Sequence, residues 1–164
     1  MTNFKLKGMK KYQLMLSKTF PSYHPKAGAD TGFGEKLLAA LIGGKEYAHK
    51  LHTIRANYKY WEEAFREIRD GKALLSVRQW TGKPYWSKQK EIARLTADDG
   101  IGLQKLTFTF EELKSPLVEN ASLNPDNDMI ARFDGLTLED WKAWFKPYAL
   151  TEPMAIIHFT PFRY

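Results

Sequence analysis

The chain has 164 residues, of which 43% are hydrophobic and 14% aromatic, so it can bury the core of a single domain over residues 1–164. Its 25 Lys and Arg against 19 Asp and Glu give a formal charge of +6, which favours anionic partners such as nucleic acid. The absence of cysteine excludes disulfides, thiolate catalysis and cysteine-ligated zinc.

Residues 1–11 form a basic N-terminal arm that carries Lys5, Lys7, Lys10 and Lys11 and no acidic residue. Such an arm either contacts phosphate or is a solvated terminus, and the second interpretation is favoured. The apolar run of a signal peptide is missing, and no stretch reaches the length of a membrane span. We therefore expect no membrane association and a cytoplasmic location.

The first third of the chain predicts a strand at 12–16, a loop at 17–34 and a short helix at 35–42. The loop is rich in Pro, Gly and small polar residues, and a loop of this length in a compact domain is often functional. Gly43-Gly44 would end the helix.

The remainder predicts a second helix that begins after Asn57 and reaches Arg69, with an aromatic stripe on its buried face. Strands are expected at 73–80, 91–96, 103–110 and 154–160, and a last helix between Thr137 and Pro147, while 111–128 looks irregular. Few strands are separated by helical crossovers. The expected fold is therefore α+β, an antiparallel or mixed sheet curled into a small barrel and flanked by helices.

Polar chemistry is densest in residues 50–55, where Lys50, His52, Thr53 and Arg55 set an amine, an imidazole, a hydroxyl and a guanidinium beside apolar residues. A small-ligand site needs a few such groups against an apolar lining. We therefore place the candidate site here.

This run, Lys-Leu-His-Thr-Ile-Arg, resembles the Lys-x-x-Thr-Ile-Arg signature of ASCH domains in the PUA-like superfamily. Three later stretches resemble further features of that family in the same order: the Gly-x-x-Leu-x-Val strand at 71–77, an Asp-Gly-apolar segment at 131–136 and a helix ending in Trp-Phe at 140–145. The resemblance spans residues 12–160. It implies a PUA-like β-barrel with a cleft lined by residues 50–55, and a role with RNA or modified bases.

One bacterial branch of the family removes the acetyl group from acetylcytidine with a lysine, a threonine and a glutamate. By motif position the resemblance places the lysine at Lys50, the threonine at Thr53 and the glutamate near Asp134, where this chain has the shorter acid. Thr53 would then attack the carbonyl, a neutral Lys50 would accept its proton, and Asp134 would protonate the leaving nitrogen. Arg55 would hold a phosphate or an oxyanion.

This mechanism requires the side chains of Lys50 and Thr53 to lie on the same side of the backbone. Lys50 and Thr53 are three residues apart and would face opposite sides of a regular strand, so a bulge or turn is required. His52 is more often a packed core histidine than a catalyst, and its catalytic interpretation ranks second.

A second candidate surface lies at 80–90, where Trp80, Tyr85 and Trp86 interleave with Lys83 and further lysines. Lys83, Tyr85 and Trp86 could bind nucleic acid by stacking bases and neutralising phosphates, or the aromatic residues could close one end of a barrel.

Scattered histidines and turn-like acids give no metal pattern, so we expect no metal and no cofactor. Three functions remain open. The chain is an RNA or modified-nucleotide binding module, which is preferred, an amidohydrolase of acetylcytidine-like nucleosides, or an RNA-cleaving enzyme using Lys50, His52 and Arg55.

Overall fold

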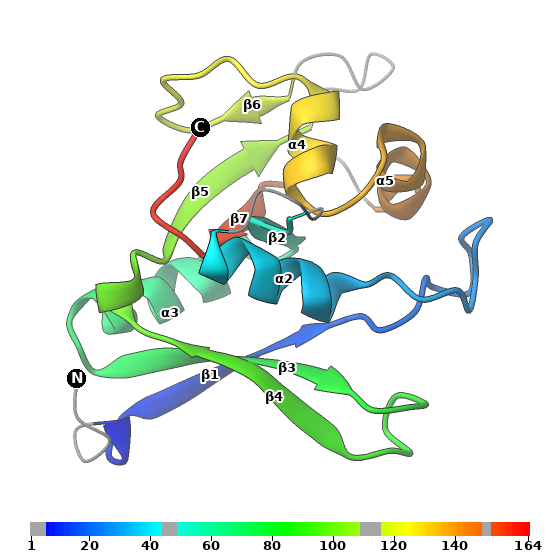
Figure 1. The fold of residues 1–164 in the computed structure, drawn as a ribbon. Coiled ribbons are helices and arrows are strands. Elements are labelled where there is room, and N and C mark those ends of the chain that lie inside the picture. The colour runs from blue at the N-terminus through cyan, green and yellow to red at the C-terminus, as the bar shows by residue number, and fades with distance from the viewer. Residues whose placement is uncertain (1–5, 44–48, 109–115, 149–151) are drawn as a thin grey trace.

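A computed structural model describes residues 6–43, 49–108, 116–148 and 152–164, which form two β-sheets and the helices packed on them (Figure 1). The first sheet has the order β1-β3-β4 and the second the order β2-β7-β5-β6. The α+β class expected from the sequence is confirmed, with mixed and antiparallel strand pairing in two separate sheets over the described residues.

The first sheet contains β1 (Lys10–Leu16), β3 (Ala73–Trp80) and β4 (Gln89–Leu95). β1 runs parallel to β3, whereas β3 and β4 form an antiparallel hairpin with a register shift between Val77 and Arg78. A parallel pair needs a long crossover, and the crossover from β1 to β3 carries the candidate site.

The second sheet is antiparallel throughout and contains β2 (His52–Arg55), β7 (Met154–His158), β5 (Gly102–Thr107) and β6 (Leu117–Val118). β7 is buried along its whole length and pairs with β2 on one side and β5 on the other. An interior strand covered on both faces is expected to be apolar, and Ile156 and Ile157 fit that position.

The helices of the described residues are α2 (Phe33–Ile42), α3 (Tyr58–Arg69), α4 (Asn127–Phe133) and α5 (Leu138–Phe145), with a short 3-10 turn, η1 (Ala97–Asp99). α3 buries Trp61, Phe65 and Ile68, which is the face predicted from the sequence. It packs on β3, β5 and β7 and therefore joins the two sheets around one core.

Several predicted details differ from the structure. Residues 127–133 form α4, which begins inside the segment 111–128 expected to be irregular and continues through residues for which no element was predicted. The Asp126 side chain accepts a hydrogen bond from the Met129 backbone N–H and caps this helix. Asn57 does precede α3, but it has a left-handed φ of 63° and its side chain makes no capping bond.

The basic arm also ends earlier than expected, because Lys10 and Lys11 begin β1 and Lys10 pairs with Glu67 at 3.2 Å. Lys5, Gly44 and residues 109–110 of the predicted strand lie outside the described residues.

Over the described ranges, no helix has the length and apolar character needed to cross a membrane. In the same part of the chain, no three acidic or histidine side chains converge in a way that could hold a metal ion.

Candidate functional site

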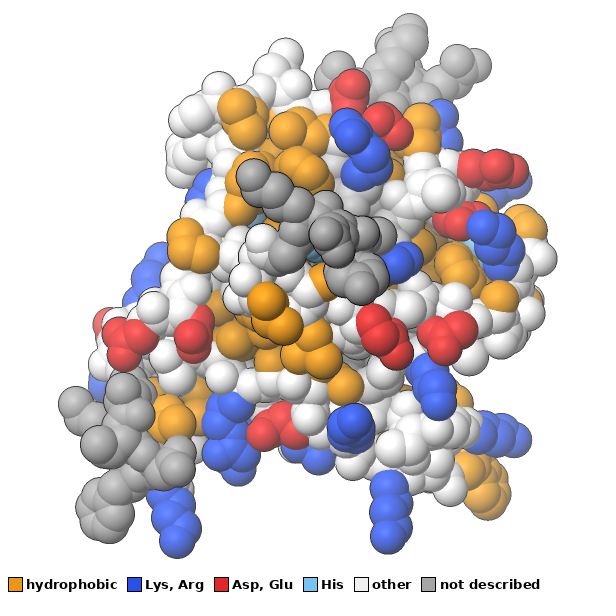
Figure 2. Space-filling model, viewed as in Figure 1, with side chains coloured by type: hydrophobic (Ala, Val, Ile, Leu, Met, Phe, Trp, Pro, Cys, Tyr) orange, Lys and Arg blue, Asp and Glu red, His pale blue; other side chains and the backbone are white. Residues whose placement is uncertain are grey.

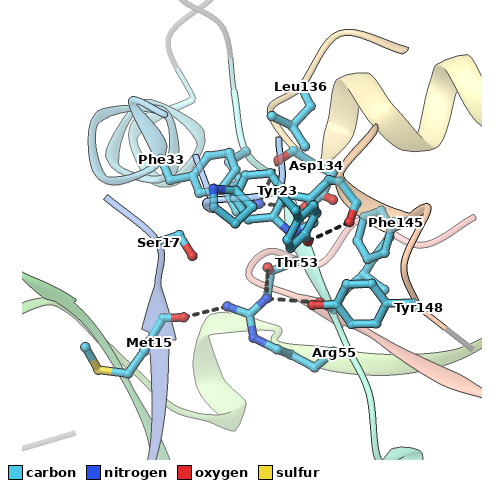
Figure 3. A pocket seen from close by; sticks show the side chains of 14 residues that line it. Met15, Ser17, Tyr23, Phe33, Thr53, Arg55, Asp134, Leu136, Phe145 and Tyr148 are labelled. Atoms are coloured by element: carbon cyan, nitrogen blue, oxygen red, sulfur yellow. Dashed lines mark hydrogen bonds and ion pairs between the residues drawn. The ribbon is translucent and has the colours of Figure 1, made fainter. Parts of the chain in front are cut away.

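A pocket of about 300 Å³ lies where the end of β1, strand β2, the start of α2 and the α4–α5 segment meet (Figure 3). Its walls combine a few ionisable groups with a larger number of aromatic and aliphatic side chains. They are Met15, Ser17, Pro21, Tyr23, Phe33, Lys50, Thr53, Ile54, Arg55, Asp134, Leu136, Trp144, Phe145 and Tyr148.

Lys50 and Asp134 form a buried ion pair in this pocket. The Lys50 Nζ donates to Oδ1 and to the backbone carbonyl of Asp134, both at 2.6 Å. It also lies 3.9 Å from the centre of the Phe33 ring, and the lysine is only 1% exposed. The pair joins the segment before β2 to the end of α4, where the Leu51 N–H donates to the Phe133 carbonyl at 2.8 Å.

Burial perturbs both members of the pair. It lowers the pKa of Lys50 to about 8, although the nearby Asp134 carboxylate works in the opposite direction. It raises the pKa of Asp134, against the attraction of Lys50 and Arg55. The two pKa values therefore move toward each other, which lowers the free energy needed to transfer a proton between the two groups.

Thr53 and Arg55 form the base of the same pocket. The Arg55 guanidinium donates to Thr53 Oγ1 at 2.8 Å, to the Ile54 carbonyl at 3.0 Å and to the Met15 carbonyl at 2.5 Å. The hydroxyl of Tyr148 points toward it from the other side (Figure 3). Because Thr53 Oγ1 accepts from Arg55, its own hydrogen stays available for a ligand or a base.

Aromatic side chains make the upper and lateral walls of the pocket, and the sequence had not marked any of them as site residues. Phe33 comes from α2, Trp144 and Phe145 from α5, and Tyr148 from the segment that follows α5. Tyr23 comes from the 17–34 loop and donates from its hydroxyl to the Trp144 carbonyl at 2.7 Å. The only earlier signal was the length of that loop, which had indicated a functional segment.

The 17–34 loop is held in place on α5. The buried His24 has its Nε2 3.0 Å from the Asp140 carbonyl, and Lys26 Nζ donates to the Asp140 carboxylate at 2.7 Å. Thr31 Oγ1 donates to the Ser17 carbonyl at 2.7 Å, which closes the base of the loop. These bonds fix the wall that Tyr23 provides.

The predicted group Lys50, Thr53, Arg55 and Asp134 is therefore brought together in one pocket. Lys50 and Thr53 share it despite their odd spacing because β2 begins only at His52, so Lys50 lies outside the strand.

His52 lies elsewhere. It is fully buried, and its Nε2 is 2.6 Å from the Tyr164 hydroxyl. Its ring is 5.5 Å from that of His158, its partner in the β2–β7 pairing. Burial holds the pKa of His52 well below its usual value, so the imidazole is neutral. The structure places His52 in the core between β2 and the C-terminal segment, not among the residues lining the pocket.

Lys83, Tyr85 and Trp86 lie in the turn between β3 and β4 and do not line this pocket. Tyr85 and Trp86 are 87% and 82% exposed, so they do not close the end of a barrel. The Lys83 Nζ lies 5.5 Å from the centre of the Trp86 ring.

The pocket has the chemistry to enclose one flat, polar ring. Aromatic walls favour stacking, while Asp134, Thr53 and Arg55 offer hydrogen-bonding groups of different types at one edge. No protein-family model matches the chain, and no curated protein or solved structure is detectably similar to it.

Proposed function

We propose that the pocket binds a single nucleobase or nucleoside, either free or as an unpaired, modified base of RNA. The observation that carries the proposal is the buried Lys50–Asp134 pair beside Thr53 and Arg55 inside aromatic walls. At about 300 Å³ the cavity is at the small end of ligand pockets, a size that suits one base or nucleoside and not a duplex.

Each part of the pocket matches a feature of a nucleoside. Unpaired bases are recognised by stacking on aromatic rings and by hydrogen bonds to their edges, and the partly exposed Trp144 and Tyr148 offer such rings. Asp134 and Thr53 can pair with donors and acceptors of a base edge. Three Arg55 N–H groups already donate within the protein, and the remaining ones can bind a carbonyl oxygen or a phosphate.

We also propose that the chain is an ASCH domain of the PUA-like superfamily and that its two sheets are the two sides of a PUA-like barrel. The motif residues Lys50, Thr53 and Arg55 share one pocket with Asp134, as the family signature would require. α3 packs on both sheets, which is compatible with this arrangement. A cytoplasmic location belongs to the same proposal.

Calorimetric titration with a panel of nucleosides, including acetylcytidine, tests the binding function. We expect saturable binding of at least one nucleoside to the wild type and weaker binding to Thr53→Val. The same substitution at Thr107, on β5 outside the pocket, is the matched control and should bind normally. Equal affinity of all three proteins would contradict the assignment of the site.

Amide hydrolysis of an acylated nucleoside is a second candidate function. It is favoured by the lowered pKa of Lys50 and by the Arg55 hydrogen bond, which leaves the Thr53 hydroxyl free to lose its proton. Thr53 Oγ would bond to the acyl carbon as its proton passes to neutral Lys50. The amide C–N bond would then break as protonated Asp134 supplies a proton to the nitrogen, and water would hydrolyse the acyl-threonine ester.

Chromatography of acetylcytidine incubated with the protein separates binding from turnover. Release of cytidine by the wild type, and none by Thr53→Val or Lys50→Met, would establish the hydrolase. If acetylcytidine binds measurably but is not hydrolysed, only the binding function is supported. An RNA-cleaving role that depends on His52 gains no support, because that imidazole lies outside the pocket.

A further inference from the structure

A second groove lies beside the pocket, at the end of the first sheet where β1 and β3 finish. It has a volume of about 380 Å³ and shares Met15, Ser17 and Pro21 with the pocket. Its far end is formed by Trp80 and Tyr85 of the β3–β4 hairpin. The two cavities are therefore adjacent, with these three residues between their other walls.

The hairpin turn presents its aromatic rings on a closed network of hydrogen bonds. The Thr81 N–H and hydroxyl both donate to the Lys88 carbonyl, at 2.9 and 2.8 Å. The Ser87 hydroxyl donates to the Lys83 carbonyl at 2.8 Å. Tyr85 is held at a φ of 68°, in the left-handed region that a bulky residue rarely adopts, and its ring packs 5.2 Å from that of Trp80.

The groove is also tied to the loop that covers the pocket. Lys18 lines the groove, and its Nζ donates to the Thr81 carbonyl at 2.9 Å. The 17–34 loop and the hairpin are thus joined by one exposed hydrogen bond.

Basic side chains predominate in the hairpin turn, whereas Arg78 of β3 pairs with Glu91 of β4 at 3.7 Å. Residues 78–90 contain Arg78, Lys83, Lys88 and Lys90 and no acidic residue. Figure 2 shows blue basic side chains beside orange hydrophobic ones at the lower right, where the hairpin lies in Figure 1. Exposed aromatic faces among basic groups suit a polyanion whose bases are unpaired.

We propose that this groove and hairpin bind the nucleotides adjoining the base in the pocket, so that the ligand is a short single-stranded oligonucleotide. The inference rests on the proposed function of the pocket and names its substrate class. One base enters the pocket, the backbone follows the groove past Ser17, and a neighbouring base stacks on Trp86 or Tyr85 while Lys83 and Lys88 neutralise phosphates.

Fluorescence anisotropy with labelled homopolymer hexamers of each of the four bases, as RNA and as DNA, tests this proposal beside titrations with the matching nucleosides. We expect at least one hexamer to bind the wild type more than tenfold tighter than its nucleoside. Trp86→Ala should weaken that hexamer about tenfold and leave nucleoside affinity unchanged. The RNA and DNA arms distinguish which backbone is preferred.

The charge component has its own matched control. Lys83→Gln combined with Lys88→Gln should reduce the slope of log affinity against log salt by about 1.4, since each phosphate contact contributes about 0.7 for a single strand. Arg69→Gln combined with Lys72→Gln removes the same charge near the opposite end of β3 and should leave the slope unchanged.

The outcomes separate the two proposals. If nucleosides bind but no hexamer gains affinity, or the hairpin variants bind hexamers as the wild type does, the groove proposal is overturned and the pocket stands. If hexamers bind through the hairpin while no nucleoside binds and Thr53→Val has no effect, the pocket proposal fails, and the hairpin binds nucleic acid without a base in the pocket.

Discussion

Removing one partner of the Lys50–Asp134 pair should destabilise the fold strongly, whereas removing both should not. In Asp134→Ala the Lys50 ammonium keeps its burial but loses the carboxylate that accepts at 2.6 Å. Breaking a buried ion pair in this way typically costs about 3–5 kcal/mol. For a chain of this length, that loss lowers the melting temperature by on the order of 10 °C.

The double variant Lys50→Met/Asp134→Leu replaces the pair with apolar groups of similar volume. Such replacements of buried pairs are often neutral or stabilising by about 1–4 kcal/mol, because the cost of removing two charges from water disappears. We therefore expect the double variant to unfold near the wild-type midpoint. The contrast would mean that the pair is not needed for stability, as a role in ligand binding requires.

Denaturant unfolding followed by far-ultraviolet circular dichroism measures all the variants, with Lys50→Met completing the cycle. A loss under about 1 kcal/mol in Asp134→Ala would refute the reasoning, because it would mean that Lys50 reaches water when its partner is gone. A double variant as unstable as Asp134→Ala would also refute it, since the pair would then be needed for folding.

Three further predictions concern stability. Burial lowers the pKa of Lys50 from 10.5 to about 8, so between these pH values the unfolded chain binds more protons than the folded one. The free energy of unfolding of the wild type, measured by denaturant titration, should therefore rise by on the order of 2 kcal/mol relative to Lys50→Met from pH 7.5 to 9.5. Burial lowers the pKa of His158 to about 3, so between pH 6.5 and 5 the wild type should lose about 1–2 kcal/mol relative to His158→Phe, and parallel pH profiles of the two would contradict this. Gly100→Ala should lower the free energy of unfolding by roughly 2 kcal/mol, because φ is 81° and the added methyl would meet a Pro161 ring carbon at 2.5 Å. Gly28→Ala, at φ 83° with open space around it, should lower it less. Equal melting temperatures of the two variants would disprove the steric contribution.

Local patterns predicted most of the elements but few of the walls of the site. The aromatic stripe of α3 and the alternation of β5 reflect periodicity, which a sequence shows directly. α4 was missed because its first turn lies between Pro125 and several Asn and Asp residues that also occur in loops. Its Asp126 cap was the signal that could have identified it.

The polar members of the site were predicted because they lie close together in the sequence or follow a motif. Lys50, Thr53 and Arg55 fall within six residues, and Asp134 was placed by the family resemblance. Tyr23 and Tyr148 come from segments far apart in the chain, and only tertiary packing brings them to the same pocket. Sequence periodicity contains no information about contacts between residues that lie far apart in the chain.

Calorimetric titration of the wild type and of Lys50→Met/Asp134→Leu with the nucleoside panel tests the central claim most directly. We expect the double variant to keep the fold, so that only the polar centre of the pocket changes. The pocket assignment predicts saturable binding of at least one nucleoside to the wild type and none to the double variant at the same concentrations. Equal binding to both proteins, or no nucleoside bound by the wild type, would contradict it.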